Sequence, residues 1–227
     1  MVILSKQVSE LDLNDSEGQL TQVVCLPNIN WSTYQAMLRD MGEHRATRVA
    51  YDQGVMTIKM PSELHEFLNR LLAYIVRTLA VELGLLCTDV GSMTLQRDDL
   101  EKSAELDTGF YIQNAISRKG TDSRIPSRIP SRIPSSLPPD LLVEVDITSP
   151  LTRRMSIYRA LGIAEVWQYT QRDSVVIHCL TGDNYAEAKV SLAFSQLTVV
   201  QLNQFLSDYQ DDIQLTRDIR RWVDSLN

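Results

Sequence analysis

The chain has 227 residues, of which 44% are hydrophobic and 22% are charged, the balance of an ordinary globular protein. This length fits one large domain, and the composition excludes wholesale disorder, collagen and coiled coil. The 22 basic and 29 acidic residues give a net charge of −7, the wrong sign for binding a polyanion through the overall field. Contact with a polyanion would therefore need a local basic patch or a metal ion.

The cysteine pattern and the hydropathy indicate a compartment. Cys25, Cys87 and Cys179 stand far apart, without a C-x-x-C pair, so neither a zinc site nor a redox motif is indicated. An odd number of cysteines in a chain of this size suits a reducing environment. The N-terminus lacks the apolar core of a signal peptide, and no stretch approaches the roughly 18 apolar residues of a membrane helix. We expect a cytoplasmic protein that does not span a membrane.

The chain opens on a weakly patterned region. Residues 1–47 are expected to form an arm and a short helix that pack on the main domain, and Ser32 is the expected N-cap of that helix. The main domain is expected to span residues 48–227 and to begin with a hairpin, because two β-prone runs flank a connection that contains Gly54.

The strongest helical pattern follows this hairpin. It opens at Pro61-Ser62-Glu63, repeats leucine and isoleucine at helical spacing, and ends at Gly84. Because the helix is broadly apolar, it is expected to lie buried against a sheet. Short strands are expected next over residues 85–90, 92–95 and 110–113, with a polar stretch over residues 97–103.

The composition changes abruptly over residues 117–139, where Ser-Arg-Ile-Pro occurs three times in tandem. Repeated prolines block helix and central strand, so this segment is predicted to be an extended, mobile loop. One interpretation is a basic finger whose Arg124, Arg128 and Arg132 contact nucleic-acid phosphates. The other is a tolerated surface insertion, because loop insertions cost little free energy.

The best strand in the sequence covers residues 141–147, and side chains alternate across it. Leu142, Glu144 and Asp146 then share one face of a strand apolar enough to be covered on both sides. Two like charges on a covered face are unfavourable unless a cation or a proton neutralises them. This favours a metal or acid–base role. The alternative is that Glu144 lies at the edge of the sheet and pairs with an arginine.

The remaining elements complete an α/β pattern. A helix is predicted over residues 152–161, and Gly162 closes it. Strands follow over residues 164–169, 175–180 and 185–190. Thr198 is expected to cap the next helix, and an amphipathic helix over residues 213–226 ends the chain. The order of helices and strands predicts an α/β domain with a mixed sheet.

Three more side chains join the candidate site. Asp107 stands at a strand entrance; alone it suits a turn, but with Glu144 it would form a hard oxygen site for Mg²⁺ or Mn²⁺. Arg154 shares the core-facing side of its helix with Tyr158, so it is expected to point toward the acids. Its alternative role is an ion pair that only neutralises the strand. His65, in the first turn of the long helix, could reach the metal or serve near the cap or surface.

An ordered set of motifs resembles a known family, the bacterial "putative restriction endonuclease" family (domain of unknown function 820), of the PD-(D/E)XK nuclease superfamily. The motifs span most of the domain, and each alone is weak. They are Glu105-Leu106-Asp107, Phe110-Tyr111-Ile112, Pro139-Asp140-Leu141-Leu142-Val143-Glu144-Val145, Thr148-Ser149-Pro150, Tyr158 and Leu161-Gly162-Ile163-Ala164-Glu165-Val166-Trp167.

The resemblance implies a restriction-endonuclease-like fold, with a mixed central β-sheet flanked by helices. It also implies a Mg²⁺-dependent endonuclease that cleaves DNA, with a homodimer as the implied assembly. By motif match, Asp107 and Glu144 are the implied metal ligands. The superfamily lysine two residues after the acid is Asp146 here, and the position to which the family moves that lysine is Arg154. Leu106 stands where proline is usual. The alternative is a catalytically weakened nuclease fold that acts as a nucleic-acid-binding or regulatory module.

Overall fold

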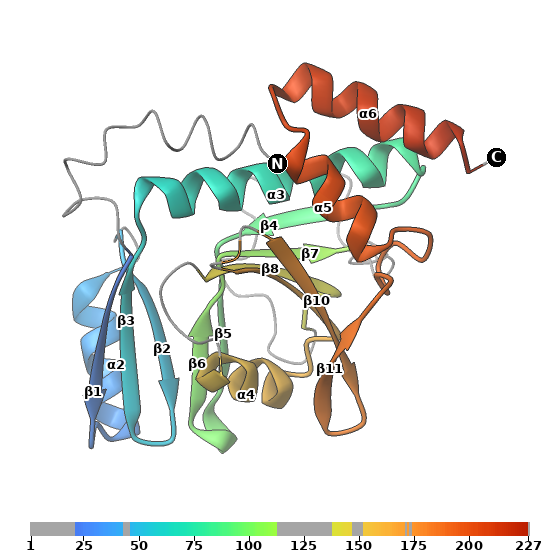
Figure 1. Cartoon of the computed structure of the whole chain (residues 1–227). Coiled ribbons are helices and arrows are strands. Elements are labelled where there is room, and N and C mark those ends of the chain that lie inside the picture. The colour runs from blue at the N-terminus through green and yellow to red at the C-terminus, as the bar shows by residue number, and fades with distance from the viewer. Residues whose placement is uncertain are drawn as a thin grey trace, which may run out of the picture.

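The computed structural model describes residues 21–42, 46–112, 138–146, 152–170, 172 and 174–226. Its strands form two sheets (Figure 1). The first sheet contains, in spatial order, β1 (Gln22–Pro27), β3 (Val55–Met60), β2 (Arg48–Asp52), β6 (Lys102–Glu105) and β5 (Thr94–Arg97), all antiparallel. The second contains β11 (Asn184–Ala188), β10 (Ser174–Thr181), β9 (Glu165–Thr170), β8 (Leu141–Asp146), β7 (Thr108–Tyr111) and β4 (Thr88–Gly91). The β8–β9 pair is parallel, so the second sheet is mixed.

The hairpin and the long helix form as predicted. The β2–β3 hairpin turns at Gln53 and Gly54, whose φ angles of 43° and 96° suit a tight turn. Helix α3 (Glu63–Glu82) begins where the Ser62 hydroxyl accepts a hydrogen bond from the His65 backbone N–H at 3.2 Å. Its apolar side packs on the second sheet with α5 (Val199–Ser207) and α6 (Asp212–Asp224). No helix in the described ranges has the length and hydrophobicity needed to cross a membrane.

Strand β8 lies inside the second sheet, because it pairs with β7 on one side and with β9 on the other. Val143 and Val145 pack into the core under α3, whereas Leu142 packs into the cluster on the opposite face. The predicted alternation is therefore confirmed, and the covered strand carries Glu144 on the face of Leu142. The alternative position for Glu144 at a sheet edge is wrong, since β8 has neighbours on both sides.

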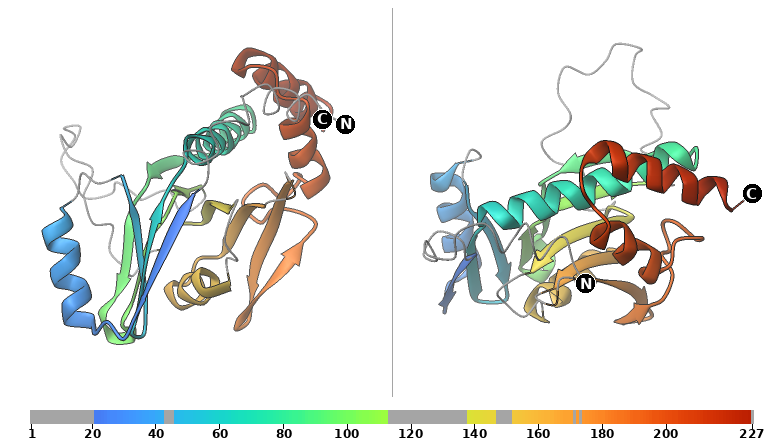
Figure 2. Two further views of the ribbon diagram at one scale, coloured as in Figure 1. Left: turned by 60° about the vertical axis from the view of Figure 1, so that its left-hand side comes forward. Right: turned by 45° about the horizontal axis from the view of Figure 1, so that its top comes forward.

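Helix α4 (Thr152–Leu161) fills the angle between the two sheets (Figure 2). Ile157 and Tyr158 pack against Ala50 of the first sheet and Leu142 of the second. A polar contact fastens the same helix, because the Ser156 hydroxyl donates to an Asp52 carboxylate oxygen at 2.6 Å. The helix thus joins the sheets into one core. On the outer face of the first sheet, α2 (Trp31–Met41) packs through Tyr34.

The chain crosses from one sheet to the other at Leu106 and Asp107. Strand β6 ends at Glu105 in the first sheet, and β7 begins at Thr108 in the second. Leu106 is fully buried, and its backbone N–H donates to the Met93 carbonyl at 2.9 Å. This crossing fixes Asp107 at the junction of the two sheets.

Several local predictions differ from the structure. The α2 helix is capped by Asn30 rather than Ser32: the Asn30 side chain accepts from the Thr33 N–H at 2.8 Å, and the Ser32 hydroxyl donates to the same oxygen. Residues 102 and 103, expected at the end of a polar stretch, belong to β6 because that strand pairs with both β2 and β5. Strand β1, within the expected arm, pairs with β3. The Ser-Arg-Ile-Pro repeat lies outside the described residues.

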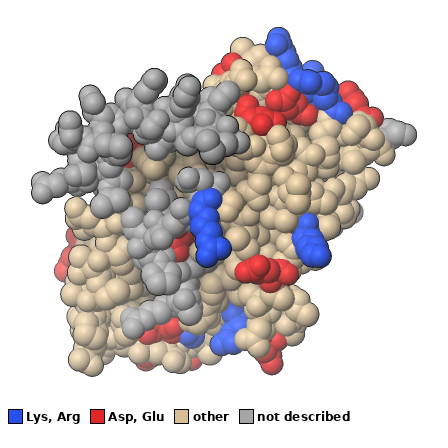
Figure 3. Space-filling view, viewed as in Figure 1, with Lys and Arg blue, Asp and Glu red and all other residues tan. Residues whose placement is uncertain are grey.

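The surface face in Figure 3 carries lysine and arginine side chains interspersed with acidic ones. Among the described residues of this face, the basic side chains do not gather into one broad patch. With a net charge of −7, the field there offers little long-range attraction for a polyanion.

One buried carboxylate, at the start of β9, holds two hydrogen-bond donors in place. Glu165, fully buried, accepts hydrogen bonds from the Trp167 indole N–H and the Ala193 backbone N–H, both at 2.7 Å. Glu165→Gln sets an amide NH₂ against one of these donors, so we expect the free energy of unfolding to fall by about 1–3 kcal/mol. Urea denaturation measures it. Glu187→Gln, at an exposed site of β11, is the control and should stay within about 0.5 kcal/mol of wild type. Equal stability of the two variants would contradict the assignment.

Candidate active site

The sheet junction brings two acids together. Thr108 of β7 is paired with Val143 of β8, and the two strands run antiparallel. The next positions along the strands are therefore Asp107 and Glu144, which face each other beyond the end of the ladder. Both side chains are buried, with 0% and 1% of their surface exposed. The two acids predicted from sequence thus meet.

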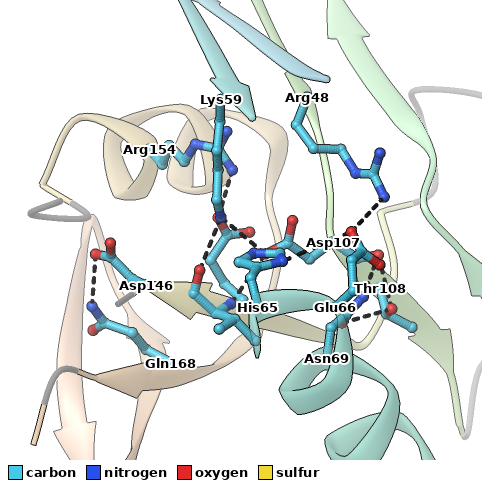
Figure 4. A network of polar contacts seen from close by, with 12 residues as sticks. Arg48, Lys59, His65, Glu66, Asn69, Asp107, Thr108, Asp146, Arg154 and Gln168 are labelled. Carbon is cyan, nitrogen blue, oxygen red and sulfur yellow. Dashed lines mark hydrogen bonds and ion pairs between the residues drawn. The ribbon is translucent and has the colours of Figure 1, made fainter. Parts of the chain in front are cut away.

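Lys59 lies between the two acids. Its Nζ is 3.2 Å from Asp107 Oδ2 and 3.3 Å from Glu144 Oε1, and it donates to the Val145 carbonyl at 2.9 Å (Figure 4). Only 6% of its side-chain surface is exposed. Three short contacts use the three ammonium donors. Lys59 comes from β3 of the first sheet, so this ion pair ties the two sheets together.

Three donors converge on one oxygen of Asp107. Besides Lys59, the His65 Nε2–H donates to Oδ2 at 2.9 Å and the Val145 backbone N–H at 3.1 Å. Burial by itself would raise the pKa of Asp107, but the charge of Lys59 and the hydrogen bond from His65 outweigh it and hold that pKa well below its ordinary value. Asp107 is therefore ionised at neutral pH.

The opposite oxygen of Asp107 is different. Oδ1 is buried and has no hydrogen-bond partner among the residues that the structure describes. An unsatisfied buried carboxylate oxygen is unfavourable, so it marks a position where a further donor or a cation would be stabilised. Behind it, the Asp107 backbone is held in place, since its carbonyl accepts from Asn69 at 3.4 Å and from the Thr108 hydroxyl at 2.8 Å.

Glu144 is held by α4. The Arg154 guanidinium donates through Nη1 to Oε1, and the Tyr158 hydroxyl donates to Oε2 at 2.9 Å. Burial and then the negative charge of Glu144 raise the pKa of Tyr158 well above its usual value, so its hydroxyl keeps the proton that it donates. Burial would lower the pKa of Arg154, but the facing Glu144 raises it. The predicted inward direction of Arg154 is confirmed, and so is the ion pair.

The remaining predicted residues divide into those inside and outside this cluster. His65 is fully buried on Asp107, so the surface interpretation of this histidine is wrong. Asp146 lies to one side, half-buried, where Gln168 Nε2 approaches it at 3.4 Å (Figure 4). It shares the face of Glu144 without joining the contacts around Lys59. The three arginines of the proposed finger lie outside the described residues: Arg124, Arg128 and Arg132.

Sequence reasoning missed Lys59 and Tyr158 as members of the site. A lysine in a hairpin strand usually extends to solvent, so the pattern of β3 gave little reason to single it out. Charge balance is the signal that could have found it, because Arg154 neutralises only one of two buried acids. The second acid requires another cation, and Lys59 lies four residues before the start of the helix that carries His65.

Asp107 and Glu144 fit a small divalent ion. Hard carboxylate oxygens are the ligands of Mg²⁺, which keeps several waters and commonly binds through one or two carboxylates. The unpartnered Oδ1 of Asp107 is the observation that favours such an ion. In the described part of the chain, no three histidine, cysteine or acidic side chains converge as a preformed metal cluster. An ion here would have two protein ligands, and water or substrate oxygens would complete its coordination.

The sequence also matches a known protein family. Residues 31–216 fit the profile of the family described as "Putative restriction endonuclease". The chain belongs to this family. The match covers most of the chain, including β2 through α5 and every residue of the cluster around Lys59. The α/β architecture with its mixed sheet is therefore a restriction-endonuclease-like fold, as the motifs implied. A search of curated proteins finds no match to this chain.

The Lys59 ion pair should dominate the stability of the junction. Lys59→Met keeps the length of the stem but leaves two buried carboxylates facing Arg154 alone, so we expect the free energy of unfolding to fall by about 3–5 kcal/mol without divalent ions. Lys189→Met, at an exposed site, is the matched control and should change it by less than about 0.5 kcal/mol. Chemical denaturation at neutral pH compares the two. A loss no larger than that of the control would refute the ion-pair role.

Proposed function

We propose that this chain is a Mg²⁺- or Mn²⁺-dependent endonuclease that hydrolyses phosphodiester bonds of DNA. Membership of the restriction endonuclease family supports a nuclease-type function. The observation that carries the proposal is that Asp107 and Glu144 lie close together, each within hydrogen-bonding distance of the same atom, Lys59 Nζ. Restriction-endonuclease-like proteins generally use divalent metals, and these two acids supply the oxygen ligands that such an ion requires.

Each side chain has a distinct role in this proposal. Asp107 and Glu144 would hold the ion, which when bound polarises a phosphate and acidifies a water molecule. Arg154 binds the phosphate, since its Nη2 is buried and has no hydrogen-bond partner among the described residues. It stays protonated and therefore stabilises negative charge rather than removing a proton. His65 and Tyr158 are positioning residues, because each fixes one carboxylate. A role for Asp146 remains a prediction.

A second function is favoured by one observation. Lys59 and Arg154 together supply two positive charges to the two acids, so both acids already have a cationic partner. Acids that are already paired suit a nuclease fold that has lost turnover and acts as a nucleic-acid-binding or regulatory module. The two functions differ in whether a divalent ion is required for phosphodiester cleavage.

The proposed setting is cytoplasmic. Cys25, Cys87 and Cys179 are free thiols, which suits a reducing compartment. We also propose a homodimer, because a cleft between two copies would give an acidic protein one local surface for a polyanion. Arg124, Arg128 and Arg132, within residues 117–139, stay part of this proposal as candidate nucleic-acid contacts.

The nuclease proposal predicts metal-dependent cleavage. Asp107→Asn and Glu144→Gln keep the shape of each side chain but remove a charged ligand, so we expect the cleavage rate to fall at least about 100-fold. A supercoiled plasmid incubated with Mg²⁺ or Mn²⁺ provides the assay, and exposed Glu187→Gln is the control. Wild-type cleavage in excess chelator, or none with either metal, would eliminate the metal-dependent function; binding of DNA without cleavage would favour the second one.

Arg154 is expected to limit the rate. A lysine at this position keeps the positive charge, and unlike arginine it can share its proton with a nearby water or phosphate oxygen. We therefore expect Arg154→Lys to raise the cleavage rate, by about tenfold, in the same plasmid assay. A rate that is unchanged or lower would count against this role for Arg154.

A further inference from the structure

Lys59 stands where the two acids would share a cation. Its ammonium contacts one oxygen of each acid, and the Val145 carbonyl fixes it from a third direction. The stem reaches this point from β3, and almost none of it is exposed. The lysine is thus a cation tethered to the fold, and an ion bridging the acids from this side would have to displace it (Figure 4).

The charges disfavour a divalent ion beside Lys59. Lys59 and Arg154 already balance the charges of Asp107 and Glu144, so a divalent ion would bring two uncompensated positive charges into a buried site. Like charges a few ångströms apart in a protein interior repel strongly, because the effective dielectric constant there is well below that of water. An entering ion therefore needs either the departure of Lys59 or a new negative charge.

A phosphodiester would supply that negative charge at the right side chain. Arg154 already contacts Glu144 through Nη1, while its buried Nη2 has no partner among the described residues. A phosphate oxygen accepting from Nη2 would lie beside the cluster and also attract the Lys59 ammonium. Departure of Lys59 would then open Asp107 Oδ2 and Glu144 Oε1 to the ion on the side that the ammonium occupies, beside Asp107 Oδ1, which has no partner in the described structure.

We propose that Lys59 is a tethered competitor that keeps the Asp107–Glu144 pair closed to divalent ions until a phosphodiester draws it away. The inference rests on the proposed function and adds the order in which the site is filled. Because coupling between two ligands is reciprocal, DNA should tighten metal binding by the same factor by which the metal tightens DNA binding.

Metal binding itself tests this inference. Mn²⁺ is titrated calorimetrically into the full chain, with and without a short phosphorothioate DNA duplex that resists hydrolysis. We expect Lys59→Met and Lys59→Gln to bind Mn²⁺ at least about tenfold more tightly than wild type without DNA. The DNA should raise the Mn²⁺ affinity of wild type toward that of the Lys59 variants. Lys189→Met is the matched control, and Asp107→Asn with the same DNA corrects for ions bound by the duplex.

The possible outcomes separate the two proposals. Equal Mn²⁺ affinity in wild type and the Lys59 variants would overturn the competitor role and leave the metal-dependent nuclease standing. If neither wild type nor a Lys59 variant binds Mn²⁺ in a way that depends on Asp107, with or without DNA, there is no metal site and both proposals fail. Variants that fold only when Mn²⁺ is present support the competitor role. If they fold under neither condition, wild type decides: a DNA-dependent gain supports the role, and identical affinities with and without DNA overturn it.

Discussion

The architecture of this protein depends on the neutralisation of two carboxylates inside the fold. Asp107 and Glu144 face each other where β7 and β8 diverge, and neither side chain reaches bulk water. Burying two such charges is unfavourable unless cations of good geometry accompany them. Lys59 arrives from one sheet and Arg154 from the helix between the sheets, so the cluster can form only when both sheets and α4 are in place. The site is therefore complete only in the fully packed structure.

The sequence predicted the elements better than their pairing. The β2–β3 hairpin, α3 and α4 carry local signals: a glycine turn, a serine cap and a closing glycine. Strand β6 has no such signal, because its polar residues become strand only by pairing with two neighbours. The division into two sheets was missed for the same reason, since strand order follows from tertiary packing and not from local propensity.

In the candidate site, too, local patterns predicted some residues, whereas tertiary packing determined the others. Glu144 was predicted because an acid on the inner face of an apolar strand is unusual, and Asp107 because of its motif. Lys59 is separated from them by 48 and 85 positions, a relation that no local spacing reveals. The inward side of His65 could not be fixed from a cap alone, because it depends on how α3 lies across the sheet junction. The strand pattern and the motifs thus indicated the acids, whereas only packing placed the cation between them.

Leu106, where the chain crosses between the sheets, stabilises the backbone next to Asp107. Leu106 donates its backbone N–H to Met93, a bond that a proline nitrogen lacks the hydrogen to make. Its side chain also fills the core beneath α4. A proline at position 106 would therefore lose both this main-chain hydrogen bond and apolar packing next to Asp107. The orientation of one buried acid thus depends on the backbone N–H of the residue before it.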